Sequence, residues 1–206
     1  FNTNAGCLTS AIAAEEIKQF ADQIFDQLRK QVVPLIEHFA QSDPTPKKTL
    51  DLENRLHDRF RETGRELIQW LFSRLEPAIE QMPGTITHHG KYHRRLGDKS
   101  RRADVLTRFG KVSFLRGRYR RGRSGRTIFP LEMLLGIENG FTPAAADRVG
   151  KQFAATGSSQ GRTLEMVADQ MGSQIGTEKL RKLVGTLADG MEPFRKDAQV
   201  QKLMNL

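Results

Sequence analysis

The sequence predicts a mainly α-helical protein with a small antiparallel β-hairpin or sheet at its centre. Apolar residues recur every three or four positions over long stretches on both sides of the centre, which is the spacing of a helix face. A central stretch instead alternates at every second position around a glycine, which is typical of a hairpin. We expect three regions: a helical hairpin over residues 1–87, a basic β-hairpin region over 88–130, and a helical, helix-turn-helix-like region over 131–206.

The composition is that of an ordinary folded domain. The 206 residues are 37% hydrophobic and 28% charged, so the chain is not a disordered tail. No apolar run approaches the roughly 20 residues needed to span a bilayer, and the N-terminus lacks a signal-peptide pattern. The chain begins with Phe1 and not with Met, so we expect it to start inside a longer reading frame. These features predict a cytoplasmic protein.

Two long amphipathic helices are expected in the first region. Apolar side chains from Ile17 to Phe39 share one helix face in residues 11–41, where Pro34 is the expected site of a kink. Two prolines in residues 42–46 end this helix, and Thr49 is the expected cap of the next. Helices joined by such a short loop should form an antiparallel hairpin. Its apolar faces either fill the protein's own core or form a homodimer.

Positive charge is concentrated in the centre of the chain. Residues 88–126 contain fourteen Lys or Arg and only two acids, Asp98 and Asp104, whereas the whole chain carries +9. A concentrated basic segment attracts polyanions and releases their counterions. Nucleic acid is therefore the first partner to consider.

The basic segment also has the pattern of a β-hairpin. Val105, Thr107 and Phe109 alternate with Leu106 and Arg108, and a second strand follows from Val112. We place Gly110 and Lys111 between them in a two-residue loop with a type II′ turn. Beyond that loop Arg116, Arg118 and Arg120 share one face.

The arginines of this predicted strand suit phosphate recognition. Guanidinium groups bind phosphate through a bidentate fork, and Tyr119, beside Arg121 on the opposite face, either stacks on a base or packs internally. The alternative is a solvated edge strand whose charges prevent aggregation.

Cysteine and histidine usage makes a metal site unexpected. Cys7 is the only cysteine, which excludes an internal disulfide and a cysteine-based zinc site. His88, His89 and His93 cluster, but the neighbouring Lys and Arg side chains would repel a cation. We therefore assign the histidines to the basic surface and expect no cofactor in this chain.

Helices return after a short apolar run over residues 129–137 and a turn at 139–140. Thr142 followed by Pro143 predicts a helix start, and a glycine-containing break follows at 157–161. A second helix is stopped by Gly172, and Thr177 is the expected cap of a third. The arrangement is that of a helix-turn-helix, although structural bundles share this outline.

The third of these helices is the expected recognition helix, with Lys179, Arg181 and Lys182 near its start. The full set of side chains expected to contact DNA is Lys91, Arg94, Arg95, Arg101, Arg102, Arg116, Arg118, Arg120, Arg121, Arg123, Arg126, Lys179, Arg181 and Lys182.

Several motifs also resemble a known family. The central ones are Thr107, Phe109, Gly110, Val112, Arg116 and Tyr119, and then Phe129, Pro130, Leu131, Glu132, Leu135 and Gly136. With residues 63–67 and 177–184, they resemble the module in front of the catalytic domain in bacterial insertion-sequence transposases of the ISKra group. The similarity covers most of residues 60–190, and the strand motif is its most specific part.

The resemblance implies an N-terminal region that binds the DNA ends of the element, followed by an RNase H-like domain with an acidic, metal-binding triad. Many relatives carry a cysteine pair where this chain has Gly122, Ser124 and Gly125, so no zinc knuckle is implied. The chain ends at Leu206, before the implied catalytic domain would start, and a divalent metal is expected only in such a domain. Asp147, Asp169 and Asp189 show no triad motif. We therefore expect no DNA cleavage by this chain alone.

Two other functions compete with this one. A stand-alone repressor or RNA-binding module would use the Arg- and Gly-rich residues 116–126, because such segments suit shape-tolerant RNA contact. A hydrolase would need a nucleophile with a base, or paired carboxylates, and no local motif supplies either. The leading hypothesis is a DNA-binding, nucleoid-associated region of a transposase that recognises element ends.

Overall fold

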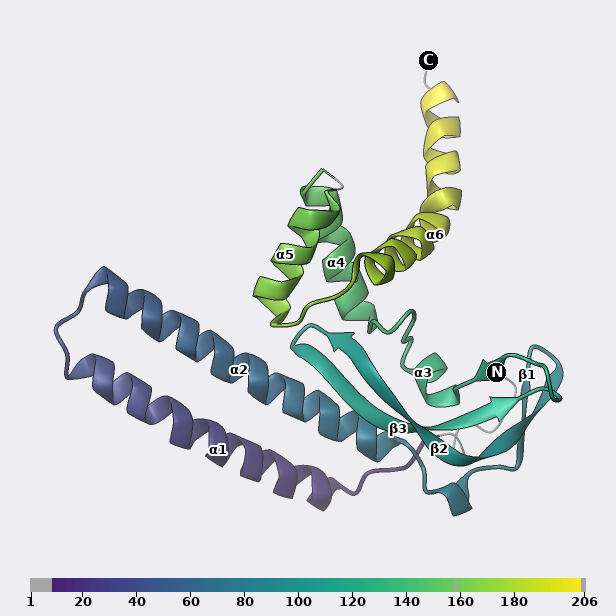
Figure 1. Ribbon diagram of the computed structural model, residues 1–206, viewed down its shortest axis with the longest axis horizontal. Helices are drawn as coiled ribbons and strands as arrows, with labels where there is room; N and C mark the ends of the chain where they lie inside the picture. Colours follow the sequence, from purple (N-terminus) through teal and green to yellow (C-terminus); the bar gives the residue numbers. More distant parts are fainter. Residues whose placement is uncertain (1–8, 158, 205–206) are drawn as a thin grey trace.

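The computed structural model describes residues 9–157 and 159–204, with side chains up to residue 190 except those of Ala103 and residue 158. Cys7 therefore lies outside the described residues. Two long helices, α1 (Ala14–Ala40) and α2 (Pro46–Leu75), lead through the short 3₁₀ turn η2 (Ile79–Gln81) into a four-stranded sheet and four further helices (Figure 1). The predicted mainly helical class with a small antiparallel sheet is confirmed.

The antiparallel helical hairpin is confirmed, but the predicted start of its second helix is wrong. Thr45 is the N-cap of α2, where its Oγ1 accepts a hydrogen bond from the backbone N–H of Lys48 at 3.3 Å, and Pro46 is the first helical residue. Thr49 lies inside the helix and donates its hydroxyl to the Thr45 carbonyl. Proline suits the first helical position because it has no N–H to satisfy there, so the helix starts earlier than the hydrophobic pattern indicates.

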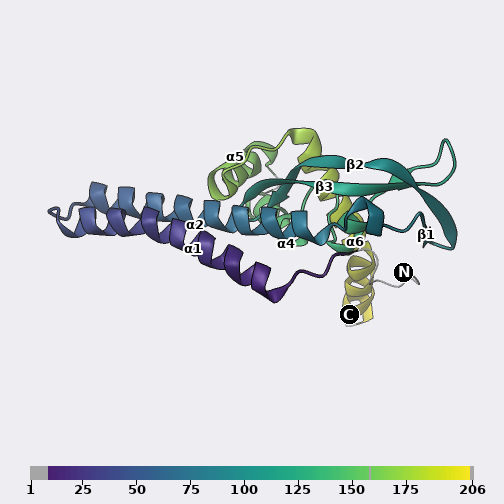
Figure 2. The same cartoon turned by 90° about the horizontal axis from the view of Figure 1, so that it is seen from below.

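The two long helices project from the rest of the protein (Figure 2) and pack lightly on each other. The rings of Phe20 and Trp70 stack with centroids 4.3 Å apart. Ile24 is the buried residue of α1, and Phe72 is the buried residue of α2. Of the apolar residues expected on the inner faces of these helices, Ile17, Ile36 and Phe60 remain exposed, whereas most of the others are half-buried.

The sheet has the order β1-β2-β3-β4 and is antiparallel throughout. Its strands are β1 (Thr85–His88), β2 (Lys91–Thr107), β3 (Gly110–Arg120) and β4 (Thr127–Ile128). The central β2–β3 hairpin matches the prediction, whereas the sequence pattern did not predict the short outer strands. Short outer strands carry too few residues for a detectable alternation.

The β2–β3 loop lies two residues earlier than predicted. Arg108 and Phe109 form it, and Gly110 already pairs with Thr107. The Thr107 hydroxyl accepts a hydrogen bond from Phe109 N at 3.1 Å and donates one to Gly110 O at 2.8 Å. Gly110 has a φ of +119°, so it closes the hairpin where a side chain would be strained.

Helix α2 lies along the part of β3 that precedes its short pairing with β4 at Tyr119 and Arg120. The Gln69 side chain accepts a hydrogen bond from Ser113 N at 2.7 Å and donates one to Ser113 O. Further along, Glu76 accepts a hydrogen bond from Gly117 N at 2.5 Å. These contacts satisfy backbone groups that an open strand edge would expose, and they fix the sheet against the helical hairpin.

The C-terminal helices are α3 (Pro130–Leu134), α4 (Pro143–Ala155), α5 (Gln160–Met171) and α6 (Thr177–Met204). The predicted cap at Thr142 is confirmed, since its hydroxyl accepts a hydrogen bond from Ala145 N. The predicted stop at Gly172 is also confirmed, because this glycine adopts a left-handed φ of +58°. Helix α6 begins at Thr177 itself, so the predicted cap at that residue is wrong by one position.

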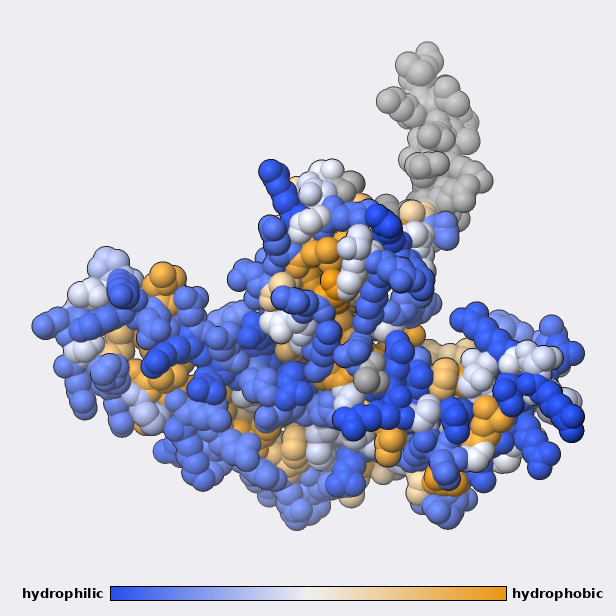
Figure 3. All heavy atoms as spheres, in the orientation of Figure 1, coloured by the Kyte–Doolittle hydropathy of each residue, from blue (hydrophilic) through white to orange (hydrophobic). Residues whose placement is uncertain are grey.

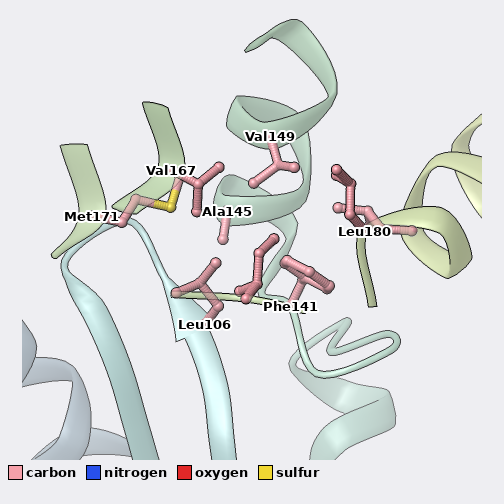
Figure 4. Close-up of a cluster of buried hydrophobic side chains, with 9 residues drawn as sticks. Leu106, Phe141, Ala145, Val149, Val167, Met171 and Leu180 are labelled. Carbon is pink, nitrogen blue, oxygen red and sulfur yellow. The ribbon is translucent and has the colours of Figure 1, made fainter. Parts of the chain in front are cut away.

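Two hydrophobic clusters join the three expected regions. Leu106 of β2 packs with Phe141, Val149, Val167 and Leu180 of the helical region (Figure 4). A second cluster unites side chains from α2, the sheet and the segment around α3, namely Phe72, Val105, Val112, Phe114, Leu131 and Ile137. The β2–β3 hairpin therefore contributes to both hydrophobic clusters, and both helical regions pack on it.

Candidate nucleic-acid interface

Three arginines meet on one face of the sheet. In the β2–β3 register Arg94 lies directly opposite Arg120, and Leu96 lies opposite Arg118. Cross-strand partners share a face, and so do residues two apart on one strand, so the three guanidinium groups stand on the same side. We call Arg94, Arg118 and Arg120 the arginine patch. Like charges directly opposite each other destabilise a sheet unless something compensates them.

Within the described part of the chain, no acidic side chain forms an ion pair with the arginine patch. Arg94 is exposed, while Arg118 and Arg120 are half-buried. Arg118 donates its Nε hydrogen bond to the backbone carbonyl of Asp98 at 3.2 Å, which leaves its charge uncompensated. The Nε of Arg120 is shielded from solvent and has no hydrogen-bond partner among these residues. The patch is consequently a concentration of positive charge with no acidic partner among the side chains that the structure describes.

Exposed groups extend the arginine patch. The β3–β4 loop exposes Arg121, Arg123 and Arg126. On the patch face itself, Tyr92 lies two residues before Arg94 and is 77% exposed. This end of the sheet is strongly hydrophilic at the surface (Figure 3). An exposed aromatic ring beside guanidinium groups can add base stacking to phosphate contact.

The expectation that Arg116 belongs to an exposed row of arginines is wrong. Arg116 is only 9% exposed, and it forms an ion pair with Glu132 while its guanidinium lies 3.4 Å from the centre of the Phe129 ring. Burial lowers the pKa of Arg116 to about 10, with a further contribution from neighbouring Arg102. Arg102 is half-buried and its Nε lies 3.1 Å from the same Glu132 carboxylate. Both arginines therefore hold α3 against the sheet.

Tyr119 also packs internally, so the packing alternative holds for this residue. It is 2% exposed, its hydroxyl donates a hydrogen bond to Pro83 O at 2.9 Å, and burial raises its pKa. The chain segment before β1 covers this side of the sheet and leaves the Tyr92 side open. The two-residue spacing of Tyr92 and Arg94 could have predicted that they share a face of β2. Which face of the sheet is open depends on the segment before β1, which packs on the other face.

The other expected contacts near the sheet are divided between surface and interior. Lys91 and Arg101 are exposed. Arg95 is half-buried and donates hydrogen bonds to the carbonyls of Ile79 and Met82. It therefore holds the segment before β1 and is poorly placed to reach DNA.

The histidines lie beside the basic surface but differ in exposure. His93 is buried, whereas His89 is exposed and its ring centre is 4.0 Å from that of His88. Burial and the neighbouring histidines lower the pKa of His88. The described residues contain no group of three His, Cys, Asp or Glu side chains arranged to hold a metal ion.

The start of α6 forms a second basic surface. Arg181 and Lys182 are exposed, and Lys182 forms an ion pair with Glu178 at 2.7 Å. The Nε of Arg181 donates a hydrogen bond to Gln160 Oε1 at 3.3 Å. Lys179 faces inward instead, where it donates a hydrogen bond to Asp104 O at 2.7 Å and burial lowers its pKa. Of the three expected contacts on this helix, Arg181 and Lys182 remain available.

Comparisons with models of protein families, with curated proteins and with solved structures found no match to this chain. No helix in the described ranges is both long and apolar enough to cross a membrane.

Proposed function

We propose that this chain binds double-stranded DNA and serves as the end-binding region of an insertion-sequence transposase. The arginine patch carries the proposal, because Arg94 and Arg120 are like charges in direct cross-strand opposition without a protein counter-charge among the described residues. A phosphate backbone supplies the missing negative charge, and guanidinium groups bind it in bidentate fashion. The resemblance to transposases of the ISKra group supplies the biological context.

In this proposal the sheet provides affinity and α6 provides sequence discrimination. The patch and the loop arginines contact phosphates, which position a protein but carry no direct sequence information. Arg181 and Lys182 lie on the exposed face of the first turns of α6, the part of a recognition helix that approaches base edges. Strand cleavage and joining are no part of the proposed role. A protein with this role would be associated with the bacterial nucleoid.

The test is fluorescence anisotropy of a labelled duplex over a range of salt concentrations. Replacing Arg94 and Arg120 together by Ala removes two phosphate contacts, so the slope of log K against log salt should fall by about 1.8. The matched control is Lys18→Ala with Arg29→Ala, which removes two exposed charges from α1. Equal slopes for the two double variants would refute the proposed role of the patch.

An RNA-binding role is the second candidate, and Tyr92 is the observation that favours it. Exposed aromatic rings beside arginines stack on unpaired bases, which are more frequent in RNA than in duplex DNA. Tighter binding of single-stranded RNA than of duplex DNA, with a large loss in Tyr92→Ala, would favour that candidate.

Helix α1 favours the homodimer that the sequence left as one of two alternatives for its apolar face. Phe25 and Ile36 are 56% and 50% exposed, and their eleven-residue separation places them almost on one line along the helix. Exposed apolar rows on an amphipathic helix are typical of association surfaces. A two-fold dimer would also carry two arginine patches.

A further inference from the structure

A notch is lined by side chains of α2, the β2–β3 turn, α4 and α5. It lies at the β2–β3 turn, where β3 begins, whereas Arg120 is the last residue of that strand. Its volume is about 620 Å³. That size falls within the range of roughly 300–1,000 Å³ that is typical of small-ligand sites. The function proposed above uses none of the residues that line it.

Two aromatic rings form the apolar part of the notch. Phe60 of α2 is 55% exposed, and Phe109 of the β2–β3 turn is 41% exposed. The Phe109 ring packs directly against the backbone of Gly64, because a Cβ at Gly64 would lie 2.5 Å from the ring. The absence of a side chain at Gly64 thus allows the turn to dock on α2 and hold Phe109 in place.

Three arginines form the charged part. Arg61 forms an ion pair with Asp58 at 3.0 Å, and its guanidinium fills the space that a side chain at Gly172 would need. The Nε and Nη2 groups of Arg148 both donate to Gln170 Oε1, at 3.1 and 2.7 Å. Arg148 thus bonds to a neutral amide and keeps its full charge, while Arg61 shares its charge with Asp58. Both side chains line the notch.

Arg108 adds charge from the turn itself. It is exposed and lines the notch. The described residues that line the notch include no acid, and Asp58, beside His57 in the chain, is paired with Arg61. The notch therefore combines exposed aromatic faces with a net positive charge.

We propose that the notch binds one unpaired nucleotide of a nucleic-acid strand, an inference that rests on the DNA-binding function proposed above. Sites for single-stranded nucleic acid combine these two features, because every base has a π-face and every nucleotide carries a phosphate. The base stacks on Phe60 beside Phe109, and Arg108 and Arg148 bind the phosphate. An intact duplex would not use the site, since its bases are already stacked.

The experiment compares a blunt duplex with the same duplex carrying a four-thymidine overhang, by fluorescence anisotropy at fixed salt. The wild type should bind the overhang duplex roughly tenfold more tightly, which is the scale of one stacked base. Phe60→Ala and Arg108→Ala should each lose most of this preference and keep their affinity for the blunt duplex. Leu50→Ala is the matched control, because it removes another exposed apolar side chain of α2, 59% exposed, that does not line the notch.

A second readout reports stacking directly. A 2-aminopurine in the overhang should lose fluorescence when the wild type binds and regain most of it with Phe60→Ala. If the wild type binds both duplexes equally, the nucleotide site is refuted while the DNA-binding proposal stands. If it binds neither, both proposals fail. Equal losses on both duplexes in Phe60→Ala would also refute the site.

Discussion

Arg116 and Arg118 are neighbours on one face of β3, yet replacing each by Ala should affect a different property of the protein. Arg116 is buried against Glu132 and Phe129, whereas Arg118 is half-buried and donates its hydrogen bond to a backbone carbonyl. We expect Arg116→Ala to reduce the free energy of unfolding, and Arg118→Ala to reduce DNA affinity.

The magnitude for Arg116 follows from its burial. Its side chain and that of Glu132 are 10% and 13% exposed, so removing the arginine leaves a carboxylate largely buried. Losing one partner of a buried pair costs about 3–5 kcal/mol, and the low end applies because Arg102 still contacts Glu132. A loss of about 3 kcal/mol lowers the melting temperature by about 6–12 °C in a chain of this length. Arg118→Ala should change stability by no more than about 0.5 kcal/mol.

The assay combines urea denaturation, followed by circular dichroism, with DNA binding well below the unfolding transition. Arg116→Ala should unfold at lower urea and bind duplex DNA like the wild type while folded. Glu132→Gln should be destabilised in the same way, because it leaves two arginines without their carboxylate. Wild-type stability for Arg116→Ala, together with a larger loss of affinity than in Arg118→Ala, would refute this account and restore Arg116 to the DNA contact surface.

Three further predictions concern other parts of the chain. Burial raises the pKa of Glu76 in the folded state above its value in the unfolded chain, so the wild type loses stability as pH rises from the unfolded to the folded pKa. Glu76→Gln should therefore gain stability relative to the wild type over this pH range. A constant difference between the two in urea titrations from pH 4 to 7 would contradict this. Gly64→Ala should be at least about 1 kcal/mol less stable than Gly185→Ala. A Cβ at Gly64 would meet the Phe109 ring, whereas nothing lies within 4 Å of a Cβ at Gly185. Equal melting temperatures of the two variants would show that the ring moves freely. If α1 forms the dimer interface, light scattering should give a mass of twice 23.3 kDa for the wild type and the mass of one chain for Phe25→Asp. A wild type that is monomeric at tens of micromolar would disprove the dimer.

Local patterns were sufficient to predict the class of this fold. The helical spacing over α1 and α2, the cap at Thr142 and the stop at Gly172 depend on residues close together in the chain, and the structure has all of them. Errors of one to four residues arose where two local signals competed, as at Thr45 and Thr49. The short strands β1 and β4 were missed because they form only by pairing with a longer neighbour.

The sequence by itself also located the positive charge, because net charge over residues 88–126 is a property of composition. It could not separate exposed arginines from buried ones. Arg116 and Arg118 are the same residue type on the same face of β3, but Glu132 of α3 and Phe129, which precedes α3, cover the first and leave the second open. Likewise the segment before β1 covers Tyr119 and leaves Tyr92 exposed. Which side of a strand is covered depends on segments that pack onto it from elsewhere in the chain, so only the tertiary structure decides it.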